Sequence, residues 1–193
     1  RFAEAVEQMK RIGGECVEID FAPFLEAARL LYEGPWVAER YVAIESMIEE
    51  RPDDVFPVTR QIISGGSKPR AAEAFKAEYR LRELKRKADR TWDQVDLVMT
   101  PTIGSPYTIA EVEAEPVQLN SNLGYYTNFM NLLDYSATAF PAGMLECGVP
   151  FGVTVFAPAF HDQQLLTLAE RFLHPDRETK PEIPTGWIPI VVC

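Results

Sequence analysis

The residues best suited to hold a small ligand are a tyrosine and an arginine in residues 31–40, which read LYEGPWVAER. Gly34 and Pro35 turn the chain between two segments of helical pattern. Tyr32 therefore ends one predicted helix, and Arg40 lies about two turns into the next. A guanidinium fork binds a small carboxylate through two parallel charge-assisted hydrogen bonds, which lysine cannot reproduce. This spacing could bring a phenol and such a fork to one edge of a pocket.

The same two residues also have a simpler interpretation. Arg40 could form a surface ion pair with Glu33 or Glu39, and Tyr32 could pack as an ordinary aromatic side chain. Exposed ion pairs of this kind contribute only about 0–1 kcal/mol. Composition alone favours this simpler interpretation.

Two other groups contain residue types that could carry catalysis. Residues 64–68 read SGGSK, and His161 adjoins Asp162. The first group joins two predicted helices, so glycines that end a helix, followed by a polar connector, account for it. The second has no serine in a recognisable nucleophile turn, and Asp162 is predicted to cap the helix that follows. We therefore predict no catalytic residue in this chain.

Charge and composition argue against several classes of protein. The 193 residues carry a formal net charge of −10, whereas non-specific binding to nucleic acid needs clustered Lys and Arg. The basic run at residues 80–90 is balanced by Glu78, Glu83 and Asp89, which predicts an exposed helix face with i,i+4 ion pairs. No apolar run approaches the roughly 18–20 residues of a membrane span. We expect a protein that binds neither nucleic acid nor membrane.

Cysteine and histidine usage predicts neither a metal nor a cofactor. Three cysteines lie far apart without Cys-x-x-Cys spacing, and two histidines do not form a ligand cluster. A disulfide framework is equally unexpected, which fits the reducing cytoplasm.

Hydrophobic periodicity predicts helices that alternate with short apolar strands, the pattern of an α/β fold. The predicted helices span residues 2–12, 22–33, 35–48, 57–64, 69–92, 121–134 and 163–173. The predicted strands span residues 16–20, 95–99, 137–140 and 152–156. The last three runs are too continuous for exposed hairpins, so we expect them to share one sheet with helices on both faces. Residues 100–119 are predicted to be a long irregular stretch.

Four motifs resemble the amidase signature family. They lie at residues 96–101, 131–134, 140–143 and 148–158. The resemblance implies that residues 1–174 form the C-terminal part of an amidase-signature fold, a mixed sheet covered by helices on both faces. Residues 31–40 resemble the allophanate-hydrolysing branch of this family, in which a tyrosine and an arginine at this separation bind the carboxylate of allophanate. Tyr32 and Arg40 are thereby implied as substrate-binding residues.

The resemblance also implies an activity. The chain would be part of an amidohydrolase that converts allophanate to ammonia and carbon dioxide in urea degradation. The family's Ser-Ser-Lys triad lies in a Gly/Ser-rich segment, and these residues contain no such segment. We therefore expect the N-terminal part of the amidase domain to be a missing partner, and this chain alone to be inactive. The parent protein could form a homodimer.

The end of the chain differs in texture from the rest. Residues 175–186 are rich in proline and charge and are predicted to be a linker. Residues 187–193 are apolar again and resemble the opening of a C-terminal domain of the same branch, of which they would form the first strand.

Two alternatives remain open from the sequence. One is another amidase of the family, or the transamidating subunit that makes glutaminyl-tRNA, neither of which needs a Tyr/Arg carboxylate clamp. The other is a non-catalytic subunit that binds a small carboxylate or serves assembly. Turnover of allophanate against neutral amides would separate the enzymes, and carboxylate binding without hydrolysis would support the non-catalytic alternative.

Overall fold

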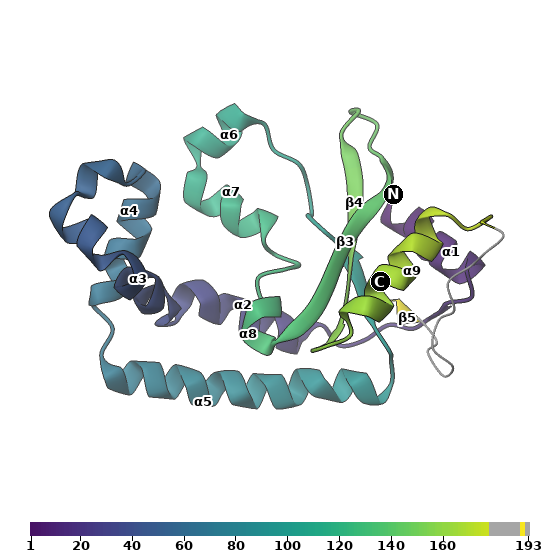
Figure 1. The fold of residues 1–193 in the computed structure, drawn as a ribbon, viewed down its shortest axis with the longest axis horizontal. Helices are drawn as coiled ribbons and strands as arrows, with labels where there is room; N and C mark the ends of the chain where they lie inside the picture. Colours follow the sequence, from purple (N-terminus) through teal and green to yellow (C-terminus); the bar gives the residue numbers. More distant parts are fainter. Residues whose placement is uncertain (178–189, 192–193) are drawn as a thin grey trace.

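The computed structural model describes residues 1–177 and the backbone of residues 190–191. A small antiparallel sheet stands towards one end of the molecule, and the long helix α5 (Ala71–Ala88) runs along its base. The short helices that follow α2 (Ala22–Glu33) gather at the opposite end (Figure 1). The two ends are thus joined by α2 and α5, which pack against each other.

The sheet contains three strands in the order β2–β4–β3. They span Val98–Pro101 (β2), Tyr135–Met144 (β3) and Pro150–Pro158 (β4). Both pairings are antiparallel, and Phe156 in the central strand lies opposite Val98 on one side and Ala137 on the other. The prediction that the three apolar runs share one sheet is therefore confirmed.

Side chains alternate between the two faces of this sheet, as the pleat requires. Met99 and Val155 point into a cluster completed by α1 (Phe2–Arg11) and α9 (Asp162–Leu173). On the opposite face Val98 and Phe156 are buried against α2, α5 and α8 (Met130–Leu133). Helices cover both faces, as predicted.

The segment between α2 and α5 forms a small cluster of its own. It contains α3 (Trp36–Glu50), η1 (Pro52–Asp54), α4 (Pro57–Ile63) and η2 (Ser64–Ser67). Tyr41, Ile48 and Val55 are its buried side chains. A Cβ on Gly66 would lie 2.5 Å from the carbonyl oxygen of Val37, so only glycine lets η2 pack this closely on α3.

Two segments differ from the predicted elements. The helix predicted at 121–134 is wrong as a single element, because the chain turns at Gly124 between α7 (Pro116–Leu123) and α8. The stretch predicted to be irregular at 100–119 contains α6 (Ile109–Ala114) and the start of α7. Local signals explain α6 and α7: Thr108 and Glu111 form a capping box, and Pro116 occupies the first turn of α7.

The predicted strand at 16–20 is also shorter than expected. Strand β1 contains only Glu15–Cys16, and it pairs in parallel with β5 (Ile190–Val191). Residues 178–189 and 192–193 lie outside the described residues, and so does most of the predicted linker and C-terminal strand. The proposed domain boundaries stay predictions.

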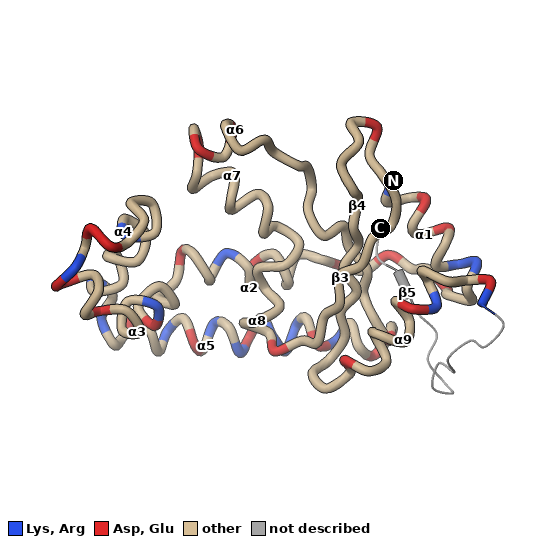
Figure 2. Tube along the Cα trace, turned by 45° about the horizontal axis from the view of Figure 1, so that its top comes forward, with Lys and Arg blue, Asp and Glu red and all other residues tan. Residues whose placement is uncertain are grey.

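Charged side chains alternate in sign along α5 (Figure 2). Lys87 and Arg82 form i,i+4 ion pairs with Glu83 and Glu78, at 2.9 Å in each case. This confirms the predicted exposed helix face. Among the described helices, none is long and apolar enough to cross a membrane.

Candidate functional site

Tyr32 and Arg40 lie on either side of the turn between α2 and α3. Tyr32 is in the last turn of α2, and Arg40 is in the second turn of α3. A Cβ on Gly34 would lie 2.5 Å from the carbonyl oxygen of Leu30 and 2.9 Å from the Trp36 ring. Glycine is therefore needed for the close turn that separates the two side chains.

Both side chains are accessible to a ligand. Tyr32 is 48% exposed, and Arg40 is exposed as well. Within residues 1–177, no hydrogen bond or ion pair involves the Arg40 guanidinium, so the surface pairs with Glu33 or Glu39 that composition favoured are not formed there. A guanidinium without an internal partner keeps its donors available for a carboxylate.

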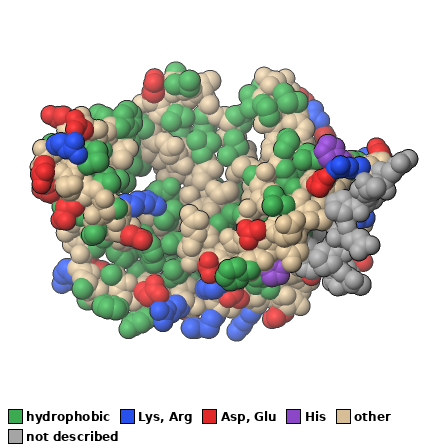
Figure 3. Space-filling model, in the orientation of Figure 1, with side chains coloured by type: hydrophobic (Ala, Val, Ile, Leu, Met, Phe, Trp, Pro, Cys, Tyr) green, Lys and Arg blue, Asp and Glu red, His purple; other side chains and the backbone are tan. Residues whose placement is uncertain are grey.

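The Tyr32 side chain borders two cavities. The larger, about 530 Å³, opens between Phe56 and Ile62 on the α4 side and Val112 and Val117 on α6 and α7. The surface is hollowed between these two parts of the molecule (Figure 3). Most of the lining is apolar, so this cavity suits a nonpolar group better than a charged one.

The smaller cavity, about 210 Å³, has a more polar lining. Arg29, Tyr32 and Glu33 come from α2, and Ser121 and Asn128 come from α7 and the turn after it. Arg40 is not among the lining residues of either cavity. The structure thus brings Tyr32, but not Arg40, to these two cavities.

Sequence reasoning did not single out Arg29 or Asn128. Arg29 lies three residues before Tyr32 on a helix whose bounds were predicted correctly, so i,i+3 spacing could have indicated it. Asn128 reaches the cavity from a distant part of the sequence, and no local pattern records that approach.

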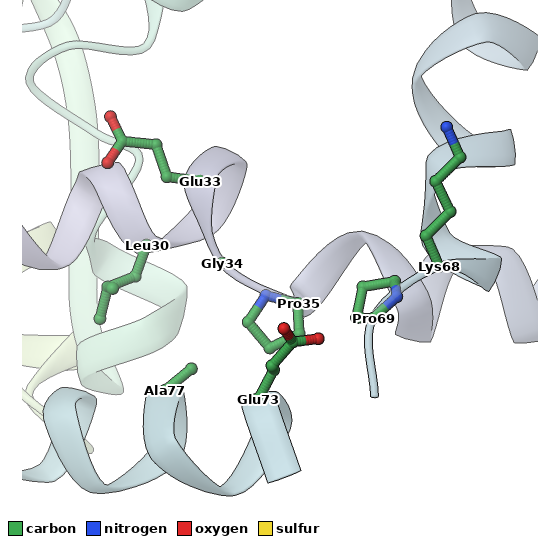
Figure 4. Close-up of a pocket in the computed structure, with 8 residues that line it drawn as sticks. All are labelled: Leu30, Glu33, Gly34, Pro35, Lys68, Pro69, Glu73 and Ala77. Carbon is green, nitrogen blue, oxygen red and sulfur yellow. The ribbon is translucent and has the colours of Figure 1, made fainter. Parts of the chain in front are cut away.

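A third hollow, about 580 Å³, lies around the Gly34–Pro35 turn where the chain approaches α5. Its charged side chains do not converge: Glu33 and Lys68 lie at opposite ends of it, and the Glu73 carboxylate lies below Pro35 (Figure 4). That carboxylate accepts a hydrogen bond of 2.8 Å from the Arg70 backbone amide. Binding sites place a few polar groups so that they converge, and this hollow does not.

The other two candidate groups have structural contacts. In η2 the Ser67 hydroxyl donates to the Ser64 carbonyl oxygen at 3.2 Å. The predicted cap by Asp162 is wrong, because α9 begins at Asp162 with His161 as its N-cap residue and without a side-chain cap. The Asp162 carboxylate instead accepts a hydrogen bond of 2.9 Å from the Ser136 hydroxyl on β3. A neighbouring strand supplies the partner, which sequence alone could not reveal.

The threonines after β2 extend the sheet. The Thr102 amide donates to the Gly152 carbonyl oxygen at 3.0 Å, and its hydroxyl lies 2.9 Å from that of Thr154. These bonds continue the pairing beyond Pro101, which has no amide hydrogen to donate. Nowhere in the described part of the chain do three or more His, Cys, Asp or Glu side chains form a group that could hold a metal ion.

Comparison with known sequences places these observations in a family. Residues 1–166 match the family described as Amidase. The chain belongs to the amidase family. This amidase chain is 43% identical, over 173 residues, to the urea amidolyase of Saccharomyces cerevisiae, an alignment that covers 89% of the chain and 9% of that relative.

A solved structure shows the same fold. The allophanate hydrolase of Kluyveromyces lactis superposes on the amidase chain with a TM-score of 0.85 and 39% identity, over 90% of this chain and 28% of that one. This confirms the predicted fold class. The chain spans about a tenth of the length of the curated urea amidolyases that it matches.

The transamidating alternative is more distant. The glutamyl-tRNA(Gln) amidotransferase of Xanthobacter autotrophicus contains an amidase-like protein that is 27% identical over 194 aligned positions, which cover 88% of this amidase chain and 39% of that protein.

Proposed function

We propose that this chain is part of an allophanate hydrolase, an amidohydrolase that releases ammonia and carbon dioxide from allophanate in urea degradation. The observation that carries this proposal is the 43% identity to a urea amidolyase, against 27% to the amidotransferase. The likeness to an allophanate hydrolase structure at 39% identity supports the same choice.

Within this enzyme, Tyr32 and Arg40 bind the carboxylate of the substrate. Their exposure and the absence of a partner for Arg40 among the described residues support this role. The arginine fork would donate to both carboxylate oxygens, and the tyrosine hydroxyl would donate a further hydrogen bond to the same end. Fixing that end of a small substrate orients its amide bond relative to the nucleophile, which is a large part of catalysis.

The bond-breaking step belongs to residues outside this chain in our proposal. A serine of the family's Ser-Ser-Lys triad would attack the amide carbonyl, expel the amine and form an acyl-enzyme that water then hydrolyses. A cytoplasmic location is also part of the proposal, and Cys16 and Cys147 are free thiols, as expected there. A homodimeric parent protein stays a prediction.

The clamp is tested by Arg40→Lys in the complete enzyme that contains this chain. Lysine keeps the charge but lacks the planar fork, so we expect kcat/KM for allophanate to fall roughly ten- to a hundred-fold. Tyr32→Phe removes only one hydroxyl and is expected to lower kcat/KM less. The melting temperature of each variant shows whether the fold is intact.

Arg86→Lys provides the matched control. Arg86 is also exposed on a helix, and it does not line the cavities next to Tyr32. Near-wild-type turnover of allophanate by Arg40→Lys would rule out the clamp. Equal kcat/KM for allophanate and neutral amides in the wild-type enzyme would instead favour a general amidase.

A further inference from the structure

The smaller cavity beside Tyr32 combines a small size with a polar lining. Its volume of about 210 Å³ lies below the roughly 300–1,000 Å³ of pockets for drug-sized ligands. Leu25 and Ala28 supply an apolar wall, while Arg29 and Asn128 contribute polar groups. Such a cavity suits a ligand of few atoms that carries both charge and hydrogen-bonding groups.

Arg29 is placed to share a ligand with Tyr32. The two residues are three apart on α2, so their side chains lie on the same face of the helix, and both line this cavity. Glu33 follows Arg29 at i,i+4 spacing, yet no ion pair or hydrogen bond involves the Arg29 guanidinium within residues 1–177. Arg82 at comparable spacing does pair with Glu78, at 2.9 Å. The Arg29 donors are therefore available to a bound anion.

Asn128 is held against the opposite side of the cavity by a close contact with Gly124. A Cβ on Gly124 would lie 2.3 Å from the Asn128 side-chain oxygen, so the amide occupies space that any other residue at 124 would fill. The Asn128 backbone amide also donates to the Gly124 carbonyl oxygen at 2.9 Å. An asparagine amide both donates and accepts hydrogen bonds, and the Glu33 carboxylate accepts them.

We propose that Arg29 is a further substrate-binding residue, which binds the substrate carboxylate together with Tyr32, while Asn128 and Glu33 bind the urea-type N–H and C=O groups. The cavity then selects a small carboxylate with a neighbouring urea group. The negative charge of Glu33 disfavours a second carboxylate on the ligand. This inference rests on the proposed function and adds three residues to those that select the substrate.

The test uses the complete enzyme and two ligands of the same shape. Allophanate carries the carboxylate, and biuret has a neutral amide in its place. Arg29→Gln is expected to raise KM for allophanate about tenfold or more, with a smaller effect on kcat and little effect on the inhibition constant of biuret. Asn128→Leu is expected to weaken both ligands, because both present the urea group.

Arg86→Gln is the control for removing an exposed arginine, and melting temperatures report on folding. Arg29→Lys is expected to restore part of the affinity that Arg29→Gln loses, since it keeps the charge. A KM for Arg29→Gln within twofold of wild type, with Arg40→Lys still impaired, would overturn this inference and leave the proposed function standing. A wild-type enzyme that does not hydrolyse allophanate would overturn the proposed function itself.

Discussion

Arginine side chains in this chain fall into two groups according to their partners. Arg80 pairs with Glu83 at 2.8 Å and also with Glu26, so its guanidinium ties α5 to α2. Within the described residues, Arg29 and Arg40 have no such partner, although acidic residues lie nearby in sequence. Arginines whose donors are not used inside the protein are the ones that a substrate carboxylate can bind.

Glu83 makes the stability of this region depend on pH. Hydrogen bonds from Lys87 and Arg80 lower the pKa of Glu83 from 4.5 to about 2. The folded pKa lies below the unfolded value, so the stabilisation is present above pH 4.5 and is lost as the pH falls towards 2.

We predict that Glu83→Gln lowers the melting temperature at neutral pH, and that the difference from wild type shrinks at about pH 3. Glu50→Gln is the control, since no ion pair involves Glu50 in the described part of the chain. Thermal unfolding at both pH values measures the effect. A difference that did not change with pH would show that the ion pairs are not its source.

At the level of elements, short helices here depend on their end signals more than on periodicity. Helix α6 has only six residues and no buried side chain, so its ends supply much of its stability. The Thr108 hydroxyl accepts a hydrogen bond of 3.3 Å from the Glu111 amide, and the Thr108 amide donates to the Glu111 carboxylate at 2.7 Å. The cap also positions α7, which lines the cavities at Tyr32.

Thr108→Ala removes the side-chain acceptor of this capping box. We predict that it destabilises α6 by about 1 kcal/mol, seen as roughly fivefold faster amide hydrogen exchange across residues 109–114. Thr108→Ser keeps the acceptor and is expected to exchange like wild type. Unchanged exchange in Thr108→Ala would mean that tertiary contacts, and not the cap, hold α6.

For the whole molecule, one aromatic side chain links the sheet to the helices on one of its faces. Phe156 is fully buried, and its ring centroid lies 5.1 Å from that of Phe129 and 5.7 Å from that of Phe24. Tyr135 also stacks on it, and burial together with the Asp89 hydrogen bond raises the pKa of Tyr135. This cluster fixes α2, which carries both Arg29 and Tyr32.

We predict that Phe156→Ala lowers the free energy of unfolding by about 3–5 kcal/mol, from lost burial and a cavity that closes only partly. Phe160→Ala is the matched control, because Phe160 is 93% exposed. Denaturant unfolding of both variants gives the comparison. Similar losses in the two would contradict the assignment of this cluster as the centre of the fold.

A second prediction at this scale concerns activity. We predict that the 193-residue chain alone does not hydrolyse allophanate, because it contains no Gly/Ser-rich segment to supply the family's serine nucleophile and oxyanion donors. Ammonia release is the measurement. Steady release that follows this chain through purification, with a longer contaminant excluded by mass spectrometry, would contradict the prediction.

The sequence by itself determined the features that local patterns encode. Helix α2 begins and ends at the predicted residues, and the three apolar runs form one sheet. Its turn at Gly34–Pro35 was predicted as well, because glycine and proline restrict the backbone where they stand. Periodicity, turn residues and family motifs all act over a few residues, so a single sequence records them.

Only the tertiary structure decided which side chains meet. Ser136 binds Asp162 across two elements, and Asn128 approaches Arg29 because α2 and the α7–α8 turn enclose the same cavity. These contacts depend on how whole elements pack, and no spacing within one element carries that information. The same reason explains why sequence singled out Tyr32 and Arg40 by their turn but left the polar cavity beside Tyr32 unseen.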